Sequence, residues 1–221
     1  MAAITVSGSC SNTEGTKALP PQEGRRPGAV GSGGAATNLK GDDEFVHEIA
    51  AKNIATIELS RMALAKAASH EVKAFAQTVM DEDSAAGTKL KSVDLGSSSQ
   101  WPAGPDDEHR EAANDLAEKQ GADFDREYVK AIIATYQDLT AVLESRLDVQ
   151  SLADWKTAAA GRTQSKAMPD PDAALNDVQI RPHRSSNETT RKINQWAADT
   201  YPVAQKHLDT ARTLENAMKQ R

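Results

Sequence analysis

Four polar side chains stand at or beside the apolar faces of four stretches with helical spacing: Glu58, Asp83, Tyr136 and His207. Each residue lies near the middle of its stretch. Helix bundles build metal sites from side chains that project inward from facing helices. Carboxylate oxygen and imidazole nitrogen suit iron, manganese or zinc. The four residues are therefore candidate metal ligands, with Tyr136 placed beside the ion.

Asp83 is the most informative of the four. Successive helical residues turn by roughly 100°, and this spacing puts seven apolar residues on one face with Asp83 in its middle. The seven are Val72, Phe75, Ala76, Val79, Ala86, Leu90 and Val93. An unpaired buried carboxylate is costly, so Asp83 needs a cation, a hydrogen-bond partner or a proton. Pairing in the core with Arg61 or His207 would meet that need without a metal.

The other three candidates also have ordinary structural interpretations. His207 fits a core histidine, Tyr136 fits a core tyrosine with its hydroxyl at the rim, and Glu58 fits a solvated position at the border of its face. The strict di-metal pattern asks for Glu-x-x-His on two helices. The literal match, Glu44 to His47, falls in the first turn of its helix, far from the middle of a bundle. The metal site and the plain core both stay open.

The spacing of apolar residues predicts an all-α fold. Long helices are expected at about 43–68, 69–95, 122–149 and 190–219, with a shorter, mostly solvated one ending at Gly121. Ser69 is the expected N-cap of the second helix. Its short connection to the first predicts a helical hairpin, and the whole an antiparallel four-helix bundle of ferritin-like type. Pro202 is expected to kink or restart the last helix.

Two segments fall outside this pattern. Residues 1–41 are rich in Gly, Ser, Pro and Thr and are predicted to be a disordered tail or linker, which leaves 42–221 as the bundle domain. Residues 150–189 are predicted to form a long loop, with a short helix around Ser151 to Ala160. This loop carries a small basic cluster, Arg181, His183 and Arg184, which is a candidate partner-binding surface.

Composition excludes several classes of protein. A net charge of −6 over 221 residues argues against nonspecific nucleic-acid binding. The chain has no run of eighteen apolar residues that would span a membrane. Its single cysteine, Cys10, rules out an intramolecular disulfide framework. The Cys-Ser-Asn that begins there is similar to the mature start of a bacterial lipoprotein, which would tether the tail to a membrane, but Ser7 stands where Leu is preferred and no signal peptide is evident.

The chain resembles the bacterial domain-of-unknown-function 4142 family, of the ferritin-like superfamily. The resemblance rests on FVHEIAAKNIATIELSRMALAKAASHEVKAFAQTVMDEDSAAGTKL, FDREYVKAIIATY and YPVAQKHL, within residues 44–95, 122–148 and 196–215. It implies an exported or periplasmic envelope protein without an established activity. Glu58 and His207 fit the family pattern. The pattern has Asp-His where Glu82-Asp83 stands and His where Tyr136 stands, so two of the four candidate ligands differ.

Two functions follow from these observations. The first is a non-enzymatic helical envelope protein that acts as a scaffold or binding module. The second is a ferritin-like metal-binding or redox protein with its site at Glu58, Asp83, Tyr136 and His207. The sequence contains no Ser-His-Asp set, phosphate-gripping glycine loop or cysteine-histidine metal spacing, so hydrolytic and nucleotide chemistry are not expected.

Overall fold

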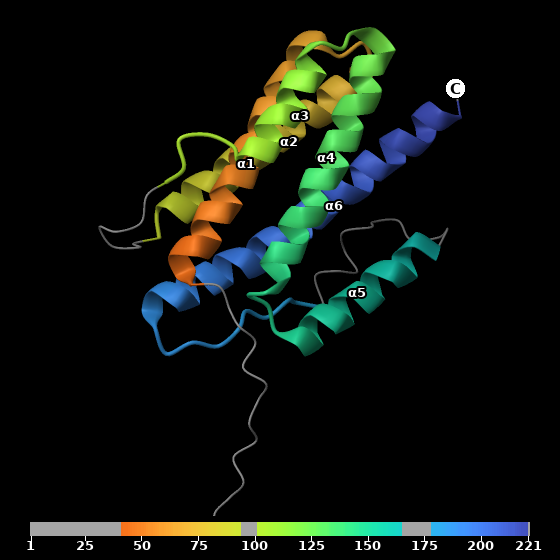
Figure 1. Ribbon diagram of the computed structural model, residues 1–221. Helices are drawn as coiled ribbons and strands as arrows, with labels where there is room; N and C mark the ends of the chain where they lie inside the picture. The colour runs from red at the N-terminus through yellow and green to blue at the C-terminus, as the bar shows by residue number, and fades with distance from the viewer. Residues whose placement is uncertain (1–40, 94–100, 165–177, 221) are drawn as a thin grey trace, which may run out of the picture. The chain divides into compact units, whose positions relative to one another are not determined.

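The computed structural model describes residues 41–93, 101–164 and 178–220. Within these ranges the chain forms six helices and no strand, which confirms the all-α class (Figure 1). The helices are α1 Asp42–Lys66, α2 His70–Lys91, α3 Asp107–Ala117, α4 Gly121–Glu144, α5 Val149–Gln164 and α6 Glu188–Lys219. The predicted tail, including Cys10, lies outside the described residues apart from Gly41.

The four long helices pack in a ring. α1 packs against α2 and α4, and α6 packs against the same two helices, while α3 lies against α1 and α4. Asp42 at the start of α1 contacts Arg146, just past the end of α4, and Thr190 in the first turn of α6. α1 and α6 therefore begin at the end of the ring where α4 finishes. This arrangement is compatible with the predicted antiparallel four-helix bundle.

The turn between α1 and α2 is fixed by side-chain hydrogen bonds. As predicted, Ser69 caps α2: its hydroxyl oxygen accepts from the backbone N–H of Glu71 at 3.1 Å and of Val72 at 3.3 Å. The Asp125 carboxylate, in the first turns of α4, accepts from the N–H of Ala68 at 2.9 Å and of Ser69 at 2.8 Å. The start of α4 thus holds the hairpin closed.

The third long helix ends earlier than the sequence suggests. α4 stops at Glu144, not at about 149, because the chain tightens into bonds from the N–H of Arg146 to the carbonyl of Leu143 (2.9 Å) and from the N–H of Leu147 to the carbonyl of Glu144 (3.2 Å). Leu147 continues the apolar spacing of α4 but reaches the core from this turn, where it is fully buried.

The segment predicted as a loop contains a regular element. α5 occupies residues 149–164 and is longer than the short helix expected there. Trp155 packs edge-on against Tyr201 of α6, with 5.5 Å between ring centroids, and Lys156 Nζ lies 2.6 Å from Glu144 Oε1. Arg181, from the predicted basic cluster, lies 3.1 Å from Asp148. Its charge is therefore partly compensated within the chain.

The last helix runs through its proline without a restart. α6 is continuous from Glu188 to Lys219, with Pro202 inside it, so of the two outcomes expected at this proline, a kink or a restart, the restart does not occur. Proline removes one backbone N–H and its ring crowds the carbonyl of Ala198. The residues on both sides of it, Tyr201 and Ala204, are buried against the other helices. Tertiary packing outweighs the missing backbone bond.

Candidate functional site

The centre of the ring is a polar cluster around Asp83. This residue of α2 is 5% exposed, and its Oδ2 accepts hydrogen bonds from the Thr56 hydroxyl of α1 and, at 2.8 Å, from the Tyr136 hydroxyl of α4. Asn53 Nδ2 donates to the backbone carbonyl of Asp83 at 2.9 Å. The expected pairing with Arg61 does not occur, since that side chain is exposed. The hydroxyls of Thr56 and Tyr136 therefore stabilise the buried carboxylate by hydrogen bonding.

Burial dominates the electrostatics of this cluster. It raises the pKa of Asp83 from its ordinary value of 3.8 to about 6, although the hydrogen bonds from Thr56 and Tyr136 act in the opposite direction. Burial, together with the nearby Asp83 charge, also raises the pKa of Tyr136 well above its ordinary value. At pH 7 the tyrosine is a hydrogen-bond donor and most of Asp83 is an acceptor carboxylate.

His207 of α6 lies beside the same cluster. His207 is 2% exposed, and the centroid of its imidazole lies 5.2 Å from that of the Tyr136 ring and 6.1 Å from that of the Phe75 ring. Burial, with a smaller effect of Lys206, lowers the pKa of His207 from 6.5 to about 4, so the imidazole is neutral at pH 7. Its Nε2 is 3.0 Å from Glu82 Oε2, yet this approach lacks hydrogen-bond geometry and Nε2 has no hydrogen-bond partner. The contact is therefore neither an ion pair at neutral pH nor a hydrogen bond.

Three of the four predicted site residues thus come together, and Glu58 does not join them. Glu58 is half-buried and lies two positions beyond Thr56, which is roughly 200° around a helix. The residue that α1 contributes is Thr56, which the sequence analysis missed. A usable signal existed, because Asn53, Thr56 and Ser60 recur at helical spacing on the buried face of α1.

A pair of hydroxyl groups, Ser60 and Tyr128, lies one helical turn along α1 from Thr56. Ser60 Oγ and Tyr128 Oη are 3.0 Å apart, and both residues are buried. Tyr128 stacks on Phe124 and meets Phe75 edge-on. The core therefore carries two successive polar contacts between α1 and its neighbours inside an otherwise apolar packing.

Metal sites of ferritin type gather several carboxylate and histidine side chains around the ion. Across the described residues, no three His, Cys, Asp or Glu side chains are grouped so that they could hold an ion. Asp83 Oδ2 is already occupied by two hydroxyls. The assignment of iron, manganese or zinc to Glu58, Asp83, Tyr136 and His207 stays a prediction.

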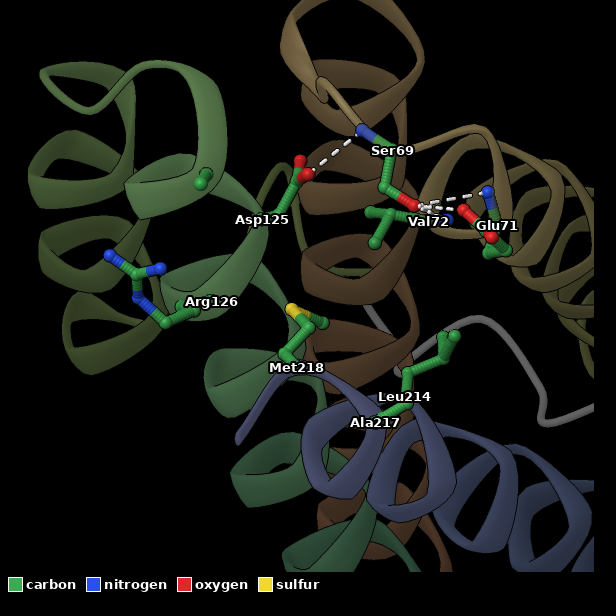
Figure 2. A pocket seen from close by; sticks show the side chains of 9 residues that line it. Ser69, Glu71, Val72, Asp125, Arg126, Leu214, Ala217 and Met218 are labelled. Carbon is green, nitrogen blue, oxygen red and sulfur yellow. Dashed lines mark hydrogen bonds between the residues drawn. The ribbon is translucent and has the colours of Figure 1, made fainter. Parts of the chain in front are cut away.

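An open recess of about 230 Å³ lies at the end of the ring opposite Asp42. The start of α2 contributes Val72, and the end of α6 contributes Leu214 and Met218 (Figure 2). Asp125 and Arg126 of α4 form another side of it, and the remaining lining residues are Ser69, Glu71, Ala122 and Ala217. Figure 2 shows Asp125 turned toward the backbone of Ser69, whose N–H donates to the carboxylate. This carboxylate therefore fixes the turn before α2 and is already hydrogen-bonded.

None of the helices in the described ranges is both long enough and apolar enough to cross a membrane.

The fold and the hydrogen bonds around Asp83 define the class of protein, an all-helical domain with a polar centre. They do not by themselves define an activity.

Residues 28–166 match the family model described as "Domain of unknown function (DUF4142)", and the chain belongs to this family. The match takes in α1 to α5 and starts within the predicted tail. It ends before α6, so His207 and the resemblance expected over 196–215 lie outside it. No curated protein and no solved structure has a significant match to the chain.

Proposed function

We propose that the chain is a non-enzymatic helical binding module whose binding site is the recess at the end of the bundle. The observation that carries the proposal is the difference between the polar centre of the bundle and the recess at its end. At the centre, the carboxylate of Asp83 already accepts hydrogen bonds from the hydroxyls of Thr56 and Tyr136. At the recess, the half-buried side chains of Leu214 and Met218 leave apolar surface open to solvent.

The ligand we assign to the recess is a single apolar side chain presented by a partner protein. A volume of about 230 Å³ lies below the roughly 300 Å³ at which sites for drug-sized molecules begin. Val72 and Leu214 offer aliphatic walls, and Met218 is a flexible thioether that adapts to differently shaped apolar groups. Apolar contact with such a surface suits an aliphatic or aromatic side chain.

The test uses indole as a stand-in for the partner's side chain. Titration of the full chain should produce saturable ¹H–¹⁵N shift changes at the amides of Val72 and Ala122. The Ala217→Trp variant fills the recess and should lose them, while Ala153→Trp, at an exposed position of α5, should keep them. Shifts that never saturate, or that persist in Ala217→Trp, would leave only a scaffold without a site here.

We also propose that the protein works in the bacterial envelope, with the N-terminal tail tethering it. The support is the family resemblance and the lipoprotein-like Cys10. Fractionation of the native host should recover the protein with envelope material, and Cys10→Ser should release it in soluble form. Recovery of the wild-type chain in the cytoplasm would contradict this location.

A ferritin-like metal-binding or redox function is the second candidate. One observation favours it, namely that Asp83, Tyr136 and His207 converge at mid-bundle. Protein purified from its native host should then contain iron, manganese or zinc, and Asp83→Ala should lower the amount per chain. Equal metal content in the two proteins would remove this candidate.

A further inference from the structure

His207 presents an unsatisfied ligand atom. Its Nε2 is buried and has no hydrogen-bond partner, although Glu82 Oε2 lies 3.0 Å away. Leaving a buried polar atom unpaired costs about 1–3 kcal/mol, so such an atom calls for an explanation. In the tautomer that carries its proton on Nδ1, Nε2 has a lone pair that a metal ion can accept.

The spacing of the two atoms suits a shared metal ion. Zn²⁺ binds imidazole nitrogen at about 2.0–2.1 Å and carboxylate oxygen at about 2.0–2.2 Å, which puts adjacent ligand atoms roughly 3 Å apart in tetrahedral or octahedral geometry. The observed 3.0 Å agrees with this value. The Glu82 side chain is 40% exposed, so an ion can arrive from solvent along it.

We propose that Glu82 of α2 and His207 of α6 bind a divalent transition-metal ion, with water completing its coordination. This pair shares His207 with the predicted mid-bundle set but uses Glu82 in place of Asp83 and Glu58. It is also independent of the recess. A mixed imidazole and carboxylate site should follow the usual affinity order, with Cu²⁺ above Zn²⁺ and Zn²⁺ above Mn²⁺. Two protein ligands make the ion exchangeable.

The experiment is calorimetric titration of the chelator-treated full chain with Zn²⁺ at pH 7, in a Cys10→Ser background so that the thiol does not compete. Wild type should bind one ion, and Glu82→Gln should bind it more than about tenfold more weakly, since a ligand is lost. Glu82 is partly exposed, so this variant keeps the fold. Glu118→Gln and His70→Gln, at exposed positions, are matched controls that should bind as wild type does.

A second measurement identifies the histidine. In a long-range ¹H–¹⁵N spectrum of the imidazoles, Zn²⁺ should shift Nε2 of His207 and leave the other four histidines unchanged. The proposal is overturned if the wild-type chain does not bind Zn²⁺, if Glu82→Gln binds it equally well, or if the shifted ring is His47, His70, His109 or His183.

Discussion

At the scale of single residues, Asp83 and His207 contribute to stability with opposite pH dependence. Asp83 has a folded pKa near 6 against an ordinary 3.8, so its contribution is fully present below pH 3.8 and is lost as the pH rises through 6. His207 has a folded pKa near 4 against 6.5, so its contribution is present above pH 6.5 and lost as the pH falls through 4. The two effects offset each other across the range between.

The Asp83→Asn variant tests the pH dependence of the contribution that Asp83 makes to stability. Relative to wild type, the free energy of unfolding of the variant should rise between pH 4 and pH 7 by as much as about 3 kcal/mol, because each pKa unit corresponds to about 1.4 kcal/mol. Urea unfolding at several pH values measures the difference. Asp81→Asn, at an exposed position of α2, should run parallel to wild type, and parallel curves for Asp83→Asn would contradict the assigned pKa.

Arg146 is a second residue whose burial has a large consequence. Its side chain is 1% exposed, lies 2.6 Å from Asp42 and sits over the ring of Phe45 at 4.4 Å. Arg146→Met should lower the free energy of unfolding by about 2–3 kcal/mol, since it removes the charge-assisted hydrogen bond to Asp42 and the bond to the carbonyl of Gly41. The matched control is Arg126→Met, which breaks an exposed pair with Asp123 and should cost less than about 1 kcal/mol in the same urea titration. Equal losses would mean that burial of Arg146 adds nothing.

The sequence predicts the burial of some of these residues but not of others. The burial of Asp83 follows from its position on a helical face, because periodicity is a local property of the chain. Arg146 could not be found in this way, since its partner Asp42 is 104 positions distant and neither residue interrupts an apolar stripe. Thr56 was missed because a small hydroxyl alone is compatible with either face of a helix, and only its spacing from Asn53 and Ser60 indicates the buried face.

At the scale of the helices, α1 and α2 approach closely at Gly87. A Cβ there would lie 2.6 Å from Asn53 Oδ1, and the Asn53 side chain is held by its bond to the carbonyl of Asp83. The glycine therefore allows the hairpin to close over the polar cluster.

The ends of the helices are harder to predict from the sequence than their buried faces. In α4 the apolar spacing continues to Leu147, but the helix ends at Glu144, and Leu147 reaches the core from the turn that follows.

Gly87→Ala should destabilise the protein even though alanine favours helices by up to about 1 kcal/mol. Overpacking against Asn53 costs about 1–3 kcal/mol, so a net loss is expected in thermal or urea unfolding. The Asn53→Ala background removes the obstacle, and there the same substitution should become neutral or stabilising. A loss of equal size in both backgrounds would show that the close approach is not the cause.

At the scale of the molecule, α5 is the least integrated helix. It lies between α4 and α6 in sequence and is anchored by Trp155, by Leu152 and by the Lys156–Glu144 pair, whereas the long helices pack extensively on one another. Regions with few buried contacts open at low free energy. We expect α5 to open separately from the ring.

Trp155→Ala should release α5 and leave the ring folded. Amide hydrogen exchange over residues 151–160 should accelerate at least about tenfold, while protection at Ile132 and Val79, both fully buried, should stay within about twofold of wild type. Ala153→Gly, at an exposed site on the same helix, controls for a change in helix propensity alone. Uniform acceleration across the chain would mean that α5 is part of one cooperative unit.

The contact at Asp42 has a mechanical consequence. A pulling force applied through the residues that precede α1 reaches the domain along the backbone at Asp42, the first residue of the helix, whose side chain is a carboxylate. The carboxylate is joined to Arg146 beyond α4 and to Thr190 of α6. A load on the leading segment would therefore be shared among three helices at its point of entry, before it could peel α1 away from its neighbours.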